Sequence, residues 1–140
     1  MIIISKATKK DIDNFSEKEW NRIDKIHYGR GVVWKEQKFI FKATEDGKTV
    51  GLVSGKLEAG VVYIGMIVTV ESARGKGVGR MLVGKAEQFG KRRGAHKMWL
   101  ITGKDWPENA FYKKTGFKIE GVLPDHHYHT DFVIYTKPIK

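Results

Sequence analysis

The sequence predicts one α/β (α+β) domain, residues 1–140, with a mixed, largely antiparallel sheet of about seven strands flanked by helices. Three observations predict this class. Apolar residues alternate on both sides of Asp46-Gly47, a pattern typical of a β-hairpin. Residues 78–94 carry apolar side chains at helical spacing. Strand-like and helix-like stretches succeed one another within 140 residues, a length that suits one hydrophobic core.

The N-terminal third predicts a short strand followed by a helix. Residues 2–6 are mostly isoleucine and form the expected first strand. Thr8 and Asp11 are spaced to cap one turn, but Ser16 and Glu19 form the stronger capping-box pattern. We therefore expect the main part of this helix to begin near Ser16.

The next stretch predicts a loop and then consecutive strands. Gly29 is expected to end the first helix, and residues 38–58 form the hairpin that turns at Asp46-Gly47. A second turn at Ala59-Gly60 leads into an apolar strand over residues 61–70.

The C-terminal half alternates helices and strands. The second helix is expected to end at Gly94 and to bury one face, made of Val78, Met81, Leu82, Ala86 and Phe89. A strand over 96–102, a short helix over 107–114 and two strands over 117–121 and 131–137 complete the order β-α-β-β-β-α-β-α-β-β.

Composition excludes several classes of protein. The chain is 41% hydrophobic and 30% charged, which is typical of a folded globular protein and not of a disordered one. It has no cysteine, which excludes disulfides, zinc–thiolate sites and a cysteine nucleophile. The N-terminus lacks signal-peptide features, and no apolar run is long enough for a membrane span. We therefore expect a cytoplasmic protein with no membrane partner.

Positive charge is concentrated in one segment. The formal net charge is +10, and residues 74–97 contain eight basic residues and one acid, which gives +7. This concentration of positive charge could bind a polyanionic ligand. Charge alone, however, favours the simpler explanation that these residues form a solvent-exposed face of a helix. No helix-turn-helix, RRM or KH signature accompanies it, so nucleic acid is not the expected partner.

The segment "RGKGVGR", residues 74–80, lies between an apolar strand and a helix. It fits neither the P-loop nor the dinucleotide-binding fingerprint, because Arg80 and Met81 stand where those motifs need other residues. Its three glycines let backbone approach an anion, and the amides of a helix N-terminus favour phosphate. The segment therefore indicates a phosphate-binding turn.

Two motifs together resemble the GNAT acetyltransferase superfamily. Residues 74–79 are similar to its R-x-x-G-x-G motif, and "NAFYKKTGF", residues 109–117, resembles its later tyrosine motif. The resemblance covers residues 61–117 and implies acetyl-CoA as co-substrate. It implies direct transfer of the acetyl group to a primary amine of unknown acceptor, a small molecule or a peptide. The alternatives are a basic nucleic-acid-binding domain and a CoA-binding protein without catalysis.

The resemblance implies roles for particular residues. The strand end should pair with the pantetheine arm, the glycine-rich turn should hold the pyrophosphate, and Tyr112 should protonate the leaving thiolate as a weak acid. Asn109 should take over a contact to CoA, because Asp105 stands where relatives often have asparagine. The implied cofactor-binding residues are Ile67, Val68, Thr69, Arg74, Gly75, Lys76, Gly77, Val78, Gly79, Arg80, Asn109 and Tyr112.

The general base is open at this point. Tyr63 occupies the position where some family members carry a glutamate. Glu71, at the end of the same strand, is our candidate catalytic base. The other candidates are Glu58, His126, His127, His129 and a chain of water molecules.

No metal site is expected. His127 and His129 alternate, but nothing elsewhere completes a zinc ligand set. By analogy with the family, their loop helps to form the acceptor pocket, with Tyr28, Trp34 and Tyr128 as candidate walls. Dimers are common in the family, so a homodimer is a further expectation.

Overall fold

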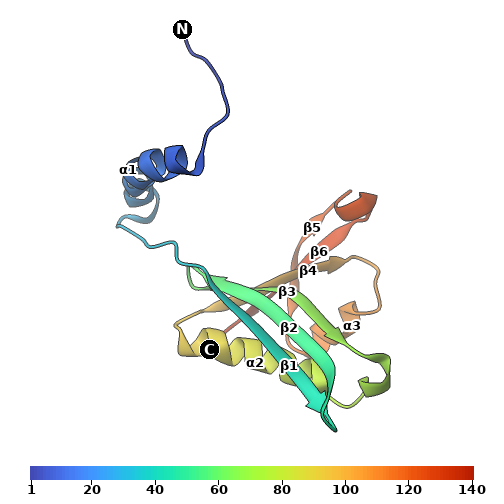
Figure 1. Cartoon of the computed structure of the whole chain (residues 1–140). Helices are drawn as coiled ribbons and strands as arrows, with labels where there is room; N and C mark the ends of the chain where they lie inside the picture. The colour runs from blue at the N-terminus through green and yellow to red at the C-terminus, as the bar shows by residue number, and fades with distance from the viewer. The chain divides into compact units, whose positions relative to one another are not determined.

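The computed structural model describes all 140 residues, which form two compact units, residues 1–34 and 35–140 (Figure 1). The first unit contains one helix, and the second contains the whole sheet and the remaining helices. A single domain over residues 1–140 stays a prediction.

The helix of the first unit is α1 (Lys9–Tyr28), and it begins earlier than expected. Thr8 Oγ1 accepts a hydrogen bond from the Asp11 amide, and the Asp11 carboxylate accepts one from the Thr8 amide, which lowers the pKa of Asp11. The prediction that Ser16 starts the helix is wrong, because this earlier capping box is formed and no glycine or proline interrupts the chain before Gly29. Gly29 ends the helix as predicted, with φ of 72°.

The predicted first strand is absent. Residues 2–6 lie outside any helix or strand, and the side chains of Ile2 and Ile4 are both 91% exposed. A strand needs a neighbour to satisfy its backbone, and β-branched composition alone does not supply one. The sheet therefore has six strands instead of the expected seven.

The second unit is built on one mixed sheet with the order β1-β2-β3-β4-β6-β5 (Figure 1). All neighbours are antiparallel except β3 and β4, which are parallel. The strands are β1 (Gln37–Glu45), β2 (Lys48–Glu58), β3 (Val61–Thr69), β4 (Lys97–Gly103), β5 (Lys118–Leu123) and β6 (Phe132–Pro138).

Both predicted turns are confirmed by the backbone. Asp46 and Gly47 have φ of 51° and 77°, and Ala59 and Gly60 have φ of 54° and 81°. Positive φ at both central residues matches the right-handed twist of the flanking strands. These turns fix the register of β1, β2 and β3.

Helix α2 (Val78–Arg92) packs across β1, β2 and β3, and the short helix α3 (Asn109–Lys114) follows β4 (Figure 1). Met81 was predicted to be buried, but its side chain is 63% exposed, whereas Val83 is buried. The buried face is thus rotated slightly from the predicted one; its members are Val78, Leu82, Val83, Ala86 and Gly90. None of the helices combines the length and the apolar composition that crossing a membrane requires.

Candidate active site

The parallel strands β3 and β4 separate along their length. Residues Val61–Tyr63 of β3 pair with Lys97–Trp99 of β4, and no later residue of β3 pairs with β4. On its other side, β3 continues to pair with β2 as far as Thr69. The edge of β3 that faces β4 is therefore free from residue 64 onward, and its backbone groups can bind an extended ligand.

A β-bulge explains where the strands separate. Ser54 of β2 pairs with Met66 and Gly55 pairs with Ile64, so Gly65 is an extra residue in β3. A bulge increases the local twist and bends the strand. Gly65 lies two residues after Tyr63, the last residue paired with β4. The sequence analysis did not identify Gly65, although a glycine inside an apolar strand is a recognised signal for a bulge.

The free edge of β3 leads into the glycine-rich turn. The short 3₁₀ turn Glu71–Ala73 follows β3, and α2 begins at Val78, with Gly77 as its N-cap at φ of 80°. The backbone amides from Gly75 to Arg80 make no hydrogen bond within the chain. Six consecutive free donors at the positive end of a helix form an anion-binding site.

The glycines of this turn have different roles. Gly75 and Gly77 adopt positive φ, and a Cβ built on either would meet no atom within 4 Å. A Cβ on Gly79 would lie 3.0 Å from the ring of Phe111. The missing side chain of Gly79 therefore makes room for Phe111 of α3, and the predicted role of its backbone at an anion stays a prediction.

Among the basic residues of the turn, Lys76 is already paired. Its Nζ lies 3.1 Å from a carboxylate oxygen of Glu45 on β1. The side chains of Arg74 and Arg80 make no ion pair and are exposed. Both remain available for an anion held by the free amides.

Tyr112 lies on α3 with a buried ring and a free hydroxyl. Its ring is 7% exposed and packs 5.5 Å from the ring of Tyr135 and 5.9 Å from that of Phe117. The hydroxyl has no hydrogen-bond partner within the chain and is not sealed from solvent. Burial raises the pKa of Tyr112 to about 12, helped by the negative charge of Glu108. The phenol therefore holds its proton over the whole working range of an enzyme.

Asn109 is engaged within the protein. Its Nδ2 donates to the carbonyl oxygens of Gly103, at 2.9 Å, and Trp106, at 2.7 Å. Its Oδ1 accepts a hydrogen bond of 2.5 Å from the Tyr135 hydroxyl. Both amide hydrogens are donated within the protein, and the predicted contact of Asn109 to CoA stays a prediction. Asn109 ties the start of α3 to β4 and β6.

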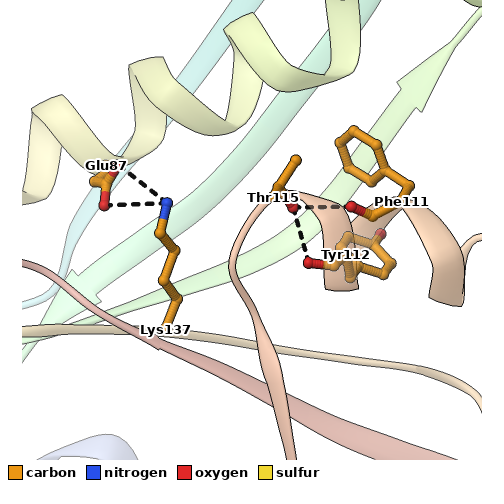
Figure 2. Close-up of polar contacts among 5 residues, drawn as sticks. All are labelled: Glu87, Phe111, Tyr112, Thr115 and Lys137. Carbon is orange, nitrogen blue, oxygen red and sulfur yellow. Dashed lines mark hydrogen bonds and ion pairs between the residues drawn. The ribbon is translucent and has the colours of Figure 1, made fainter.

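The other end of α3 is also held by side-chain hydrogen bonds within the protein, which the sequence analysis did not predict. Thr115 Oγ1 contacts the carbonyl oxygens of Phe111 and Tyr112, each at 3.0 Å (Figure 2). A threonine just after a helical segment and before a glycine is the signal that was available. α3 is therefore fixed at both ends around Tyr112.

The candidate bases lie in different places. Glu58 pairs with Val61, at the opposite end of β3 from the free edge, so about 20 Å of strand separates it from Ile67. Glu71 follows the free edge directly, is exposed and makes no ion pair. Tyr63 stacks on Trp99 with ring centroids 4.5 Å apart. Glu58 thus lies far from the free edge of β3, whereas Glu71, the loop histidines and water stay candidates for the base.

The histidine loop lies at the same end of the sheet. Its last residues lead into β6 at Phe132, which pairs with Gly103 at the end of β4. The rings of His126 and His127 pack against Phe132. His129 Nδ1 lies 2.7 Å from the Asp125 carboxylate, so this imidazole has a local partner.

The predicted pocket walls lie in both units. Tyr28 and Trp34 pack edge to face within the first unit, with ring centroids 6.0 Å apart, and Trp34 Nε1 donates to the buried Asp24. Tyr128 belongs to the second unit and is fully exposed. Tyr28 and Trp34 pack on each other, and the function of all three aromatic residues as pocket walls stays a prediction.

Comparison with known proteins agrees with the two motifs. Residues 7–117 match the model of the Acetyltransferase (GNAT) family. An uncharacterized N-acetyltransferase from Methanocaldococcus jannaschii is 32% identical over 141 residues, which cover 86% of this chain and 62% of the relative. The chain thus spans less than two thirds of that protein.

Solved structures share the fold. An acetyltransferase from Bacillus anthracis in complex with acetyl coenzyme A has a TM-score of 0.70 at 21% identity, covering 80% of this chain and 71% of that one. The ribosomal-protein-S18-alanine N-acetyltransferase from Escherichia coli has a TM-score of 0.66 at 17% identity, covering 97% and 92%. At these identities the likeness shows the fold alone.

The chain belongs to the GNAT acetyltransferase family. The co-substrate of this family is acetyl-CoA, which is present in the Bacillus anthracis structure. The residues of the second unit fit such a ligand, because a free strand edge leads to six free amides and two unpaired arginines.

Proposed function

We propose that this protein is an N-acetyltransferase that moves the acetyl group of acetyl-CoA directly to a primary amine. The observation that carries the proposal is the continuous run of unpaired backbone groups from the free edge of β3 to the start of α2. An extended arm ending in a diphosphate is the ligand chemistry that such a run would satisfy.

Binding is assigned to the backbone first. Ile67, Val68 and Thr69 would hold the pantetheine arm along the free edge of β3, and the amides of Gly75–Arg80 would hold the pyrophosphate. Arg74 and Arg80 would add charge, whereas Lys76 would first have to leave Glu45. When bound, acetyl-CoA supplies an activated thioester and a thiolate leaving group.

Tyr112 is assigned to the leaving sulfur. A phenol with a pKa of about 12 is a poor proton donor to a thiolate, whose own thiol has a pKa near 8.5. It is a permanent hydrogen-bond donor, and stabilising a developing thiolate by such a bond needs no complete proton transfer. Its role is therefore narrower than the general acid that the sequence predicts.

Glu71 is assigned to the amine. An alkyl ammonium must lose a proton before it attacks, and Glu71 is an unpaired carboxylate directly after the free edge of β3. Glu71→Gln should lower turnover most below the pKa of the acceptor amine, where little free amine is present. If the pH–rate profile keeps its shape in this variant, a histidine of the β5–β6 loop or water serves as the base.

Two measurements test the proposal. Acetyl-CoA at 100 times its Kd should stabilise the folded protein by about 2.7 kcal/mol, which a thermal shift detects. A screen of peptide and small-molecule amines with labelled acetyl-CoA should then reveal an acceptor. Absence of any thermal shift would contradict the whole proposal. Stabilisation with no acceptor across the screen would favour a CoA-binding protein without catalysis.

A further inference from the structure

Two aromatic side chains meet where the parallel strands separate. Tyr63 of β3 and Trp99 of β4 are the last cross-strand partners of these strands, and their ring centroids are 4.5 Å apart. A Cβ on Gly65 would lie 3.5 Å from the ring of Tyr63, so this ring also borders the bulge in β3. We name Tyr63 and Trp99 the aromatic pair, and it marks the start of the free edge of β3.

The aromatic pair faces away from the helices of the second unit. Side chains alternate between the two faces of a strand, and the preceding residues, Val62 and Met98, are fully buried in the core. Val62 lies against Gly90 of α2, so the buried face is the one that α2 covers. The aromatic pair therefore lies on the opposite face of the sheet, where both residues are partly exposed.

Apolar side chains continue this surface along β4 and β6. Ile101 follows Trp99 by two residues and so lies on the same face, where it is the cross-strand partner of Ile134. Both isoleucines are partly exposed. Together with the aromatic pair, they form a surface that would bind an apolar group beside the free edge of β3.

The carboxylates on both flanks of the aromatic pair are already paired. On the β2 side, Lys56 Nζ lies 3.3 Å from a carboxylate oxygen of Glu36. On the β6 side, Glu120 accepts a hydrogen bond from the Thr136 hydroxyl and lies 3.3 Å from Lys97 Nζ. The hydrogen bonds from Thr136 and Lys97 lower the pKa of Glu120. Neither carboxylate is therefore an unpaired base for an amine beside the aromatic pair.

The aromatic pair lies at the acyl end of the proposed co-substrate site, so the inference rests on the proposed function. With the pyrophosphate on the amides of Gly75–Arg80 and the pantetheine arm along Thr69 and Ile67, the acyl end points back along β3 toward Ile64. The amine that attacks the thioester then approaches beside the aromatic pair. The group attached to that amine contacts the two rings.

We propose that the acceptor is an α-amino group next to an apolar side chain, and that the aromatic pair selects this side chain. At about pH 7.5, roughly a third of α-amino groups are uncharged, against about 0.1% of lysine side chains. An α-amine therefore needs a neighbouring carboxylate much less, and the apolar rings further disfavour its charged form. The first residue of a peptide and the amide of a free amino acid share this chemistry.

Transfer to such an amine needs no further reactant. The amine nitrogen forms a bond to the thioester carbonyl carbon as the C–S bond breaks, and CoA leaves as a thiolate. The proton that the nitrogen loses passes to one of the candidate bases or to water, and the thiolate takes up one proton from solvent. The aromatic pair positions the acceptor and takes no proton.

The test compares kcat/KM for matched acceptors with labelled acetyl-CoA. Two peptides differ only in a first residue of leucine or serine, a third has a blocked N-terminus and one lysine, and leucine amide separates a free amino-acid source from a peptide. The leucine-initiated peptide should be used roughly tenfold better than the serine-initiated one, because its apolar side chain contacts the rings. It should exceed the blocked lysine peptide by about 100-fold, as its uncharged fraction does.

The decisive variant is Tyr63→Ala, which removes one ring of the aromatic pair. It should lower the preference for leucine over serine by roughly 3–10-fold, and its thermal shift with acetyl-CoA shows that it is folded and binds the co-substrate. The matched control, Tyr63→Phe, keeps the ring and loses only the hydroxyl. It should keep the preference within about twofold.

Three results would overturn the inference: equal use of the leucine-initiated and serine-initiated peptides, faster use of the blocked lysine peptide than of either, and an unchanged preference in Tyr63→Ala. Loss of the preference in Tyr63→Phe would also contradict it, because the hydroxyl and not the ring would then make the contact. If other amines of the wider screen react and none of these acceptors does, only this inference is wrong. The proposed transferase activity fails separately, when acetyl-CoA gives no thermal shift or no amine accepts the acetyl group.

Discussion

Residues 74–80 and 105–117 both follow the C-terminal ends of the parallel strands β3 and β4, yet they use their polar groups differently. In the first segment, six backbone amides have no partner within the chain. In the second, Asn109 and Thr115 donate to carbonyl groups of the protein itself. The comparison indicates that one segment is built to bind and the other to hold α3, and with it Tyr112, in place.

Tyr112 is the exception in the second segment, because its hydroxyl has no hydrogen-bond partner. We expect its replacement to have the largest effect on catalysis. Tyr112→Phe should lower kcat about 100-fold and leave the KM for acetyl-CoA unchanged, since a hydrogen bond to a developing thiolate exists only during the reaction. Steady-state kinetics with the acceptor found in the amine screen measures both parameters.

Tyr135→Phe is the matched control. It removes a neighbouring buried phenol whose hydroxyl is bound to Asn109. It should reduce the free energy of unfolding by about 1 kcal/mol and change kcat much less than Tyr112→Phe does. Equal loss of kcat in the two variants would make Tyr112 a structural residue like its neighbour.

A second prediction uses alkaline pH. The pKa of Tyr112 is raised from 10.0 to about 12 in the folded protein. A raised pKa contributes stability that is fully present below pH 10 and is lost as the pH rises through 12. The loss should reach about 2–3 kcal/mol at most.

Urea unfolding at pH 9 and near pH 12 measures this loss in the free energy of unfolding. Tyr112→Phe should lose less stability over this interval than the unaltered protein. The pKa of Tyr135 is also raised by burial, so a residual loss remains in the variant. An unchanged loss would mean that the Tyr112 phenol is hydrated in the folded state.

A third prediction tests whether the second segment only holds α3. Asn109→Ala removes three internal hydrogen bonds and should lower the free energy of unfolding by about 2 kcal/mol. Acetyl-CoA affinity, measured by calorimetry at a temperature where the variant is folded, should remain within about twofold. A tenfold loss of affinity with normal stability would support the contact to CoA that the sequence predicts.

The sequence predicted those parts of the fold that depend on residues close together in the chain. Asp46-Gly47 and Ala59-Gly60 each place a glycine at a two-residue turn between apolar strands, so both turns and the strands around them were predictable. The strand predicted for residues 2–6 is absent, because a strand needs a neighbouring strand to pair with and composition does not reveal one. The first helix has two possible capping boxes, of which the local pattern favours Ser16 with Glu19, and only the uninterrupted helix shows that Thr8 is the N-cap.

The same distinction applies to the site. Free amides after an apolar strand follow from the glycines of the turn, which is why that part of the prediction agrees with the structure. The partner of Asn109 is Tyr135, which lies 26 residues further along the chain. The role of Gly79 depends on Phe111 of another helix. Such long-range contacts leave no local pattern in the sequence.

The last prediction compares the two ends of α2 directly. Gly77 precedes the helix and Gly94 follows it, with φ of 80° and 81°, and a Cβ on either would meet nothing within 4 Å. Gly77→Ala and Gly94→Ala should therefore each cost a similar 1–2 kcal/mol of stability, the approximate penalty of a left-handed non-glycine residue.

Only Gly77 lies among the free amides, so Gly77→Ala alone should weaken acetyl-CoA binding, by about tenfold, or 1.4 kcal/mol. Isothermal calorimetry on both variants makes the comparison at matched backbone strain. If the two variants bind acetyl-CoA equally well, the anion is held by the arginine side chains, because an altered backbone at the turn would then have no effect on it.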